Sequence, residues 1–393
     1  MIDSINVKSW MTQEEACEAL GVRKQTLYAY VSRGQIEVRG DPEHVNRNLY
    51  RGSDIAELMK RRSLGRARKN IAASTMAWGV PIFNTRISTI ARGRLFYRGK
   101  DAVQFAATAT LENAAQLLWE SSREPRFPSV APMALAGSVR ARVFAAMGVA
   151  AAECGIGETL SFDALCDEGA ALIGRLASHL VALPANGDPL HARIAAAWGV
   201  EDHADLLRRV LVMLADQELS SSAFAARVTA STGASLGASV LAGLAAFSGP
   251  MHGNAIVRVR DLLDETRQAG TEAGVRQWIS RHESLPGFGH ELYPQGDPRA
   301  ADLLSLFEPP EGVRNLIECV ERIAGKKPTI DVALVALERR CALPEGAAFA
   351  LFCIARSVGW IAHSIEQKTS GSLLRPRAHY VGPAIADEDE AAD

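Results

Sequence analysis

The chain has 393 residues, of which 48% are hydrophobic and 22% are charged, and its formal net charge is -2 at pH 7. This composition is typical of a globular protein long enough for more than one domain. The near-neutral charge argues against a strong affinity of the whole protein for nucleic acid or anionic membranes, although it leaves room for a local basic patch.

The N-terminus and the cysteines both favour a cytoplasmic location. The first ten residues, MIDSINVKSW, lack the basic region and the apolar run of a signal peptide. The cysteines are scattered, without a CxxC pair or a metal-like cluster, so we expect reduced core thiols. They are Cys17, Cys154, Cys166, Cys319, Cys341 and Cys353.

The first sixty residues predict a small unit of helix, turn and helix. Thr12 and Glu15 have the spacing of a capping box, and Gly21 follows the end of this first helix. A second helix is predicted to begin near Arg23. The stretch IEVRGDPEHVNRNLY then predicts two short strands around a Gly-Asp-Pro turn.

Two stretches of this unit, TLYAYVSRG and NLYRGSDIAEL, resemble the winged helix-turn-helix of regulators of the mercury-resistance (MerR) type. The resemblance implies such a domain over residues 1–62, with DNA as a candidate ligand of residues 10–62. Residues 1–70 hold thirteen Lys or Arg against nine Asp or Glu, a net of +4, which is modest for a phosphate-binding surface. The alternative is a small domain that has lost DNA binding and packs on the rest of the chain or helps it to oligomerise.

The rest of the chain is predicted to be all-α. After a basic linker at 63–74, apolar residues recur at helical spacing through 75–385, with brief strand-like alternation in RISTIARGRLFYRGK. The segment 223–247 has the length of a membrane span, but Arg227 and its many Ser, Thr and Gly residues instead predict one buried helix. The acidic tail at 386–393 is predicted to be disordered.

Three segments of this body place ionisable residues where the helical pattern breaks. SGPMHGNA puts His252 in a turn before a helix, and KKPTIDVALVAL puts Asp331 at the start of an apolar helix. PGFGHELYPQGDPRA presents His290 and Arg299 from a loop shaped by glycine and proline. Each residue alone fits a structural role. Together, two histidines and an aspartate indicate acid–base chemistry, although spacing does not show that they meet.

These segments, followed by ARSVGWIAHSIEQ and LLRPRAHYVGP, resemble the successive signature segments of the citrate synthase family. WGVPIFNTRISTIARGRLFYRGKDAV resembles the start of the family. The resemblance covers roughly residues 75–385, and several motifs in one order are more specific than any single match. It implies a large and a small helical domain, a homodimer, acetyl-CoA as a substrate, and neither a metal nor a tightly bound cofactor.

The resemblance also implies the chemistry, an acyl transfer in which the acyl group becomes an alkyl group. Asp331 would take a proton from the methyl group of acetyl-CoA, and His252 would stabilise the enol or enolate by a hydrogen bond. His290 would polarise and protonate the ketone of oxaloacetate while the carbon–carbon bond forms. Hydrolysis of the thioester would then release citrate and CoA.

Three arginines are implied as carboxylate ligands, because a planar guanidinium binds a carboxylate through two hydrogen bonds. They are Arg299, Arg356 and Arg375, the last contributed to the partner's site across the dimer interface. Arg299 and Arg356 could instead form structural ion pairs, and Arg375 could be a surface charge. Arg356 lies in an otherwise apolar helix, which favours a substrate role because a buried cation needs an anion.

The chain departs from the family pattern at one substrate-binding position. The family's A-D-H-E-x-N reads ADQELS here, so Gln217 replaces the histidine and Ser220 replaces the asparagine. Gln217 can still donate a hydrogen bond but cannot become a cation. Three interpretations remain open: a citrate synthase, a 2-methylcitrate synthase that uses propionyl-CoA, and a DNA-binding regulator that senses a metabolite through a degenerate synthase domain.

Overall fold

The structure is a computed structural model of the whole chain. It describes residues 10–59 and 83–382, except for 33, 34, 42, 43, 45, 46, 57, 135, 154–159, 185, 186, 188, 283, 378, 379 and 381. The chain divides into two compact units, Met1–Asn84 and Thr85–Asp393. The predicted linker at 63–74 and the predicted acidic tail at 386–393 lie outside the described residues.

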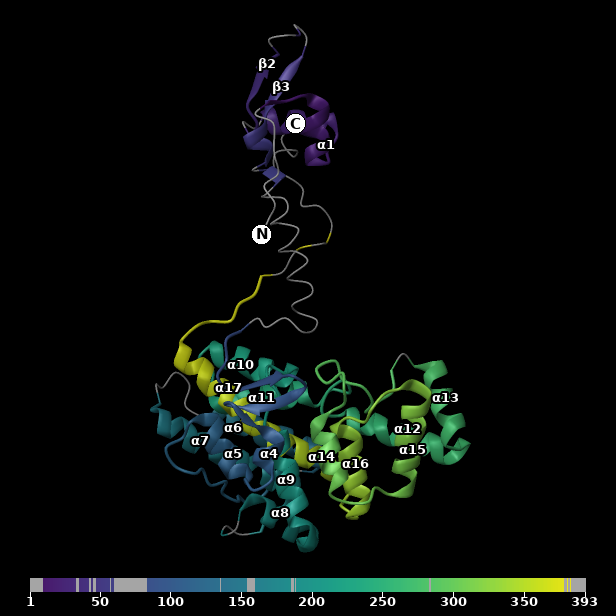
Figure 1. Cartoon of the computed structure of the whole chain (residues 1–393). Helices are drawn as coiled ribbons and strands as arrows, with labels where there is room; N and C mark the ends of the chain where they lie inside the picture. The colour runs from purple at the N-terminus through teal and green to yellow at the C-terminus, as the bar shows by residue number, and fades with distance from the viewer. Residues whose placement is uncertain are drawn as a thin grey trace. The chain divides into compact units, whose positions relative to one another are not determined.

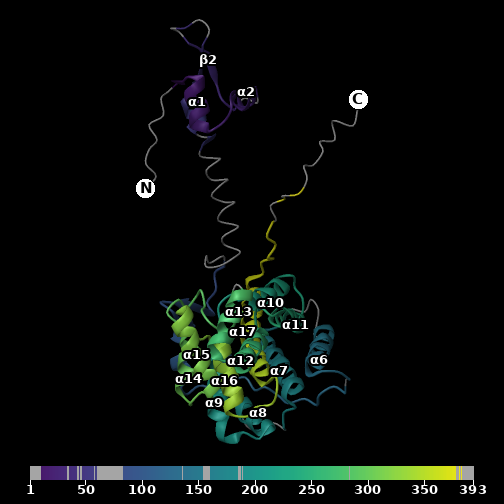
Figure 2. The ribbon, with the colours of Figure 1, turned by 90° about the vertical axis from the view of Figure 1, so that its right-hand side faces the viewer.

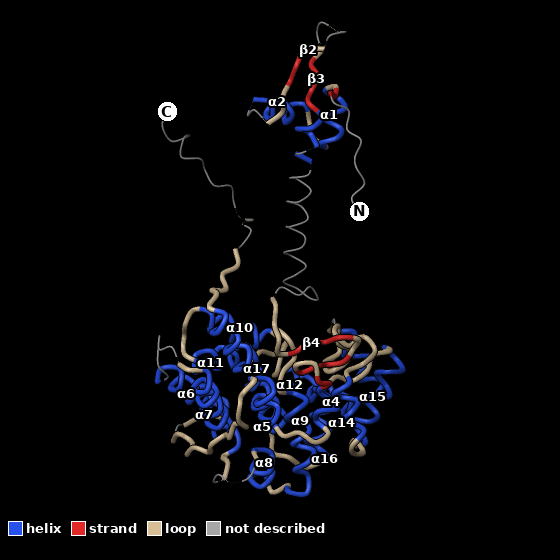
Figure 3. Tube along the Cα trace, turned by 60° about the vertical axis from the view of Figure 1, so that its left-hand side comes forward, coloured by secondary structure: helices blue, strands red, loops and turns tan. Residues whose placement is uncertain are grey.

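The first unit has the predicted helix, turn, helix and strand pair. Its elements are β1 (Trp10–Met11), α1 (Gln13–Leu20), α2 (Lys24–Ser32), β2 (Val38–Gly40) and β3 (Asn48–Arg51). Thr12 and Glu15 form the predicted capping box, and Gly21 ends α1 in a left-handed conformation. The strands form an antiparallel sheet in the order β1-β3-β2 (Figure 3). A separate small core includes Leu27, Tyr50 and Ile55.

The second unit begins with a small antiparallel sheet and is otherwise helical in its described part (Figure 1). Strands β4 (Ser88–Ala91), β5 (Arg94–Tyr97) and β6 (Lys100–Asp101) confirm the predicted strand-like stretch, and they pair in sequence order. The helices are α4 (Ala102–Ala106), α5 (Leu111–Trp119), α6 (Val139–Glu153), α7 (Phe162–Val181), α8 (Leu190–Trp198), η1 (Glu201–His203, 3-10), α9 (Ala204–Leu214), α10 (Ser221–Ser231), α11 (Leu236–Phe247), α12 (Ala255–Ala269), α13 (Thr271–Arg281), α14 (Pro298–Ser305), α15 (Glu311–Ala324), α16 (Ile330–Arg340) and α17 (Ala347–Ser370).

The helices of this unit form a large and a small group, as expected. Helices α12 to α16 pack on one another, while α17 runs through the larger group and contacts α5, α7, α9, α10 and α11 (Figure 2). By length and composition alone α17 could cross a membrane, but 94% of its most apolar window is buried within the unit. Its apolar surface is therefore covered by the neighbouring helices, as in a core helix.

The prediction of one helix over 223–247 is wrong. This stretch contains most of α10 and all of α11, which are separated by a turn at 232–235. Ser235 begins the second helix as its N-cap, because its side chain accepts a hydrogen bond from the backbone N–H of Ala238. The small residues of the stretch instead serve close packing between α10 and α11, which contact each other extensively.

Candidate active site

The connection from α9 into the first turn of α10 contacts both predicted histidines. Gln217 Nε2 lies 3.3 Å from Nε2 of His290. Ser222 Oγ lies 2.8 Å from Nε2 of His252. The two histidines are 38 positions apart in the numbering of the chain and come from different loops. This connection therefore brings them to one region of the unit.

His252 lies in the turn between α11 and α12, as predicted, and faces the start of α10. Its ring packs edge-on against Phe247 at a centroid distance of 5.2 Å. Burial, followed by the positive charge of Arg356, lowers the pKa of His252 to about 4. The imidazole of His252 is therefore neutral at pH 7. Ser220, at the family's asparagine position, caps α10, and its Oγ lies 3.3 Å from Oγ of Ser222.

The loop that carries His290 is fixed to the segment before α16. The backbone N–H of Thr329 donates to the carbonyl of Gly287 at 2.7 Å, and that of Gly289 donates to the carbonyl of Lys327 at 2.9 Å. Both glycines have a φ of +76°, which side chains strongly disfavour. The glycines of this motif thus let the loop pair with the residues that precede Asp331.

Asp297 and Arg299 form a buried ion pair next to His290. Arg299 is 1% exposed and donates from Nε and Nη2 to the carboxylate of Asp297, at 2.9 and 2.8 Å. Asp297 also caps α14 and accepts the backbone N–H of Ile330 at 3.0 Å. Burial opposes ionisation of Asp297, but the charge and hydrogen bonds of Arg299 lower its pKa. The pair therefore connects the His290 loop to the start of α16.

His290 and Tyr293 lie against this ion pair. Their ring centroids are 4.9 Å apart, and the guanidinium of Arg299 lies 5.2 Å from the centre of the Tyr293 ring. Burial and the positive charge of Arg299 lower the pKa of His290 to about 4. Burial raises the pKa of Tyr293 to about 12. Both side chains are therefore neutral at pH 7 and can act as hydrogen-bond donors.

Asp331 lies in the first turn of α16, as predicted. Its Oδ2 accepts a hydrogen bond from Oγ1 of Thr329 at 2.9 Å. Burial raises the pKa of Asp331, and the Thr329 hydroxyl and the charge of Arg299 offset only part of this effect. A carboxylate with a raised pKa is a stronger base than an exposed one, which suits removal of a proton from carbon.

Arg356 is buried in α17 and is held by one hydrogen bond, from its Nε to the carbonyl of Leu214 at 2.9 Å. Its Nη1 and Nη2 have no hydrogen-bond partner among the described residues. The guanidinium lies 5.0 Å from the ring centre of Phe352. Burial lowers the pKa of Arg356 to about 10, so it remains a cation at pH 7. These two nitrogens can bind an anion that enters the site.

A buried polar network lies directly behind Gln217. Asp216 is completely buried and accepts a hydrogen bond from Ser88, and its Oδ1 lies 3.5 Å from Nε2 of His363. Burial alone would favour the neutral acid, but His363 and Arg356 lower the pKa of Asp216. The ionised Asp216 thus supplies negative charge near Arg356 without a direct hydrogen bond to it in the described residues.

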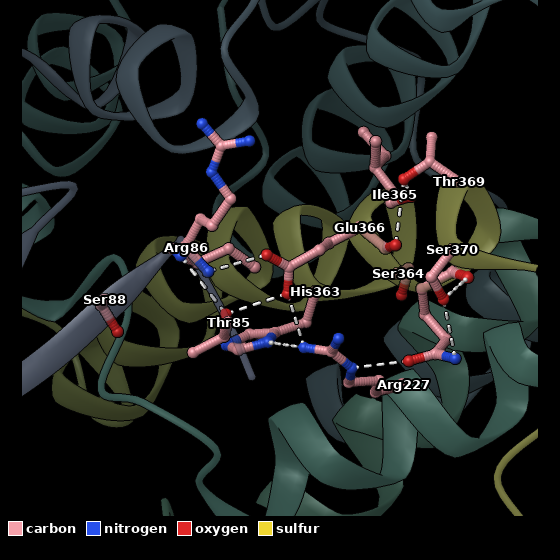
Figure 4. Close-up of polar contacts among 12 residues, drawn as sticks. Thr85, Arg86, Ser88, Arg227, His363, Ser364, Ile365, Glu366, Thr369 and Ser370 are labelled. Atoms are coloured by element: carbon pink, nitrogen blue, oxygen red, sulfur yellow. Dashed lines mark hydrogen bonds and ion pairs between the residues drawn. The ribbon is translucent and has the colours of Figure 1, made fainter. Parts of the chain in front are cut away.

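Figure 4 shows how this network continues around Arg227. Arg227 donates from Nη1 to Glu366 and from Nε to Gln367, both at 2.7 Å. Glu366 also accepts hydrogen bonds from Oγ1 of Thr85 at 2.9 Å and from the backbone N–H of Arg86 at 2.8 Å. The network therefore joins the start of the unit, α10 and α17 behind the candidate site.

Arg375 does not reach this region within the same chain. It is exposed on the segment 371–377, which follows α17 and carries no helix or strand (Figure 2). The hydrogen bond from the backbone N–H of Leu374 to Oγ of Ser231, at 3.1 Å, ties the segment to α10. Its contribution to a partner's site stays a prediction.

Three contributors were not predicted from the sequence. Ser222 and Thr329 gave no signal of their own, because their roles depend on contacts with distant residues or on the exact helix start. Asp297 did give a signal, because Asp followed by Pro is a common start of a helix. An N-cap carboxylate accepts a backbone N–H of the first helical turn, and here that N–H belongs to Arg299.

Comparisons with known proteins place the second unit in one family. The family model described as citrate synthase, C-terminal domain, matches residues 158–377. A protein named putative citrate synthase 2, from Mycobacterium tuberculosis (strain ATCC 25618 / H37Rv), is 32% identical over 343 residues, which cover 78% of this chain and 92% of that protein. Citrate synthase 2 of Bacillus subtilis is 28% identical over 46% of this chain and 51% of its own length. This chain therefore belongs to the citrate synthase family.

Solved structures confirm the predicted fold. Citrate synthase from Thermoplasma acidophilum, solved in a ternary complex with carboxymethyl coenzyme A and oxaloacetate, matches with a TM-score of 0.66 and 26% identity. The match covers 80% of this chain and 97% of that chain. Citrate synthase from Thermotoga maritima matches with a TM-score of 0.63 and 25% identity, over 80% and 98% of the two chains.

The first unit matches a family model described as helix-turn-helix domain, over residues 10–63. This match confirms the predicted helix-turn-helix. The model is not specific to regulators of the mercury-resistance type, so that finer assignment stays a prediction.

Proposed function

We propose that this protein condenses acetyl-CoA with oxaloacetate and hydrolyses the resulting thioester, giving citrate and CoA. The observation that carries the proposal is Arg356, a completely buried guanidinium whose Nη1 and Nη2 have no hydrogen-bond partner among the described residues. A buried cation of this kind is stabilised by a ligand carboxylate. The names of the relatives support the same reaction.

In the first step, Asp331 removes one proton from the methyl carbon of acetyl-CoA. Its raised pKa favours this transfer. The electron pair of the broken C–H bond forms an enolate, whose oxygen accepts a hydrogen bond from His252. With the Ser222 hydroxyl donating to Nε2 of His252, the neutral ring carries its proton on Nδ1 and can donate from there.

In the second step, the enolate carbon attacks the ketone carbon of oxaloacetate. Arg356 binds one carboxylate of oxaloacetate, and the positive charge of Arg299 attracts the other carboxylate. His290 donates a hydrogen bond to the ketone oxygen. His290 then transfers its Nε2 proton to this oxygen. Asp331 has taken one proton from acetyl-CoA and His290 has given one, so condensation is neutral in protons, and both groups exchange with solvent to return to their starting states. Water then adds to the thioester carbonyl and the C–S bond breaks. One proton of the water goes to the sulfur of the leaving CoA, the other goes to solvent, and the oxygen stays in the new carboxylate of citrate.

The test is release of free CoA thiol by the purified full chain with acetyl-CoA, in the presence and absence of oxaloacetate. Asp331→Asn removes the base, and we expect turnover to fall by about 10²- to 10⁴-fold. Asp261→Asn makes the same chemical change at an exposed position of α12 and should have no effect. Wild-type protein without oxaloacetate-dependent release would refute the proposed activity.

The same assay decides the propionyl-CoA alternative. One extra methylene changes binding in an apolar pocket by only about 1–3 kcal/mol, so both acyl-CoA substrates are to be compared. A higher kcat/KM with propionyl-CoA than with acetyl-CoA would assign a 2-methylcitrate synthase. The opposite order would assign a citrate synthase.

A second function is proposed for the first unit, which is binding to duplex DNA. The exposed face of α2 and the turn before it carry Arg23, Lys24, Gln25 and Tyr28, of which Tyr28 is 52% exposed. Leu27 on the opposite face is buried in the small core. Cationic, amide and aromatic side chains on one helix face suit contacts with phosphates and base edges.

Fluorescence anisotropy of labelled duplex DNA with the full chain tests this function. We expect affinity to fall with salt, and the slope of log K against log salt to weaken by about 2 when Arg23 and Lys24 are both changed to Ala. Arg276→Ala on α13 removes an exposed cation from the other unit as the control. An absence of binding at low salt would contradict the proposal.

A further inference from the structure

The amide of Gln217 has a fixed orientation. Its Oε1 accepts a hydrogen bond from Nη1 of Arg299 at 2.6 Å. Because a guanidinium nitrogen can only donate, the oxygen of the amide must face Arg299 and its NH2 group must point the other way. The NH2 group then faces Nε2 of His290, at 3.3 Å.

Arg299 cannot easily adapt to another amide orientation. Its Nε and Nη2 are held by the carboxylate of Asp297, and the ion pair is buried. A flipped Gln217 would place an amide N–H against a guanidinium N–H, which is repulsive. The chain of contacts from Asp297 through Arg299 therefore aims the NH2 group of Gln217 at His290.

His290 presents a second N–H at the same place. The backbone N–H of Leu292 donates to Nδ1 of His290 at 3.1 Å, so a neutral ring carries its proton on Nε2. Two N–H groups therefore converge, one from Gln217 and one from His290. Such a pair becomes favourable when one oxygen atom accepts a hydrogen bond from both.

We propose that Gln217 Nε2–H and His290 Nε2–H together form a two-donor site for the ketone oxygen of the oxo acid. The inference rests on the proposed condensation and assigns Gln217 a role of its own in it. As the new carbon–carbon bond forms, the electron pair of the C=O π bond moves onto this oxygen. Two preorganised donors stabilise the charge that develops there until the oxygen is protonated. An amide serves this purpose without titrating at any pH near neutrality.

Gln217→Glu separates this role from support of Arg299. The variant keeps an oxygen for Arg299 to bind and replaces the NH2 group by a second acceptor. We expect kcat with oxaloacetate to fall by about 10²- to 10³-fold, as when one oxyanion donor is removed. If Gln217 only positions Arg299, the carboxylate would hold Arg299 at least as well and kcat would be retained, which would overturn the proposal.

Two further variants control this result. Gln217→His restores a donor, because a neutral imidazole can accept from Arg299 at one nitrogen and donate from the other. We expect it to recover most of the kcat lost in Gln217→Glu. Gln277→Glu makes the same amide-to-carboxylate change at an exposed position of α13, and we expect wild-type kcat.

A binding measurement tests the donor pair independently of turnover. Succinate has the two carboxylates of oxaloacetate but no ketone oxygen, so titration calorimetry of both ligands isolates the contribution of that oxygen. We expect wild-type protein to bind oxaloacetate about 10²-fold more tightly or better, and Gln217→Glu to lose most of this preference. Equal binding of the two acids, or of neither, by wild-type protein overturns the donor pair. An inactive wild-type protein that still prefers oxaloacetate would refute only the condensation.

Discussion

Arg299 and Arg356 show why residues of one type in one site take different roles. Arg299 forms an ion pair with Asp297 and donates a hydrogen bond to Gln217. Most of its N–H groups therefore hold other side chains of the protein, as in a structural ion pair. Arg356 makes one hydrogen bond, to a backbone carbonyl, and its Nη1 and Nη2 find no further partner in the described part of the chain. The apolar helix around Arg356 had favoured its substrate role. The contacts of Arg299 with Asp297 and Gln217 were not predicted, because they depend on the fold of the loop and on a distant residue.

The two histidines lead to a prediction at the same scale. Burial, with an arginine charge beside each ring, lowers the pKa of His252 and of His290 to about 4. We expect the Cε1–H signals of both to show no titration between pH 5.5 and 8 in two-dimensional NMR. In denaturant the same residues should titrate near their ordinary value of about 6.5. A native transition near that pH in either ring would contradict the assignment as neutral donors.

The same shifts set the direction of a stability change. The unfolded chain binds protons at these histidines at a higher pH than the folded chain does, so folding is coupled to proton release between about pH 6.5 and about pH 4. Stability therefore falls as the pH falls through this window. Below it, both rings are protonated in the folded and in the unfolded chain, so this contribution to the free energy of unfolding no longer changes with pH.

At the scale of elements, α17 and the residues after α9 approach each other closely at Gly359. The backbone N–H of Gly359 donates to the carbonyl of Ala215 at 3.0 Å. A Cβ at this position would lie 2.2 Å from Oδ1 of Asp216 and 2.7 Å from that carbonyl. Asp216 and the Ala215 carbonyl are buried and have no room to move away. The close contact with Gly359 therefore fixes the position of Gln217, which follows Asp216 in the chain.

Gly359→Ala should therefore destabilise the protein by about 1–3 kcal/mol and weaken oxaloacetate binding, because the α9 end must move. Gly148→Ala is the matched control: Gly148 lies within α6, and a Cβ there would meet nothing within 4 Å. We expect that change to be neutral or to stabilise by up to about 1 kcal/mol. Urea unfolding of both variants checks this, and equal stabilities would contradict the close contact.

Elements were predictable where each had a local signal. Neighbouring residues predict the capping box of α1, the short strands β4 and β5, and the start of α16, whose first turn holds Asp331. The break between α10 and α11 was missed because the small residues were interpreted as serving close helix packing. Two local signals mark it, the left-handed Gly233 just after α10 and the N-cap Ser235, but each is one small residue among many of the same types.

At the scale of the whole molecule, each unit has its own core, and this explains why two family models match separate ranges of one chain. The predicted homodimer would add Arg375 to the partner's site. Since Arg375 is exposed in its own chain, its role at a site can be tested by mixing subunits.

We expect Arg375→Ala and Asp331→Asn to be nearly inactive as homodimers and to regain activity when co-expressed. A mixed dimer has one complete site, with Asp331 from one chain and Arg375 from the other. Random assortment would restore about one quarter of wild-type activity, because about half of the dimers are mixed and each has one working site. Full activity of Arg375→Ala alone, or no recovery in mixed dimers, would contradict a shared site.

The most direct test of the proposed condensation is to identify the product formed from acetyl-CoA labelled with ¹³C at the methyl carbon, with oxaloacetate and the full chain. Carbon NMR should show the label in a methylene group bonded to the carbinol carbon of citrate, and none should appear with Asp331→Asn. Label that stays in acetyl-CoA, or that is released as acetate, would show that no carbon–carbon bond forms and would contradict the account.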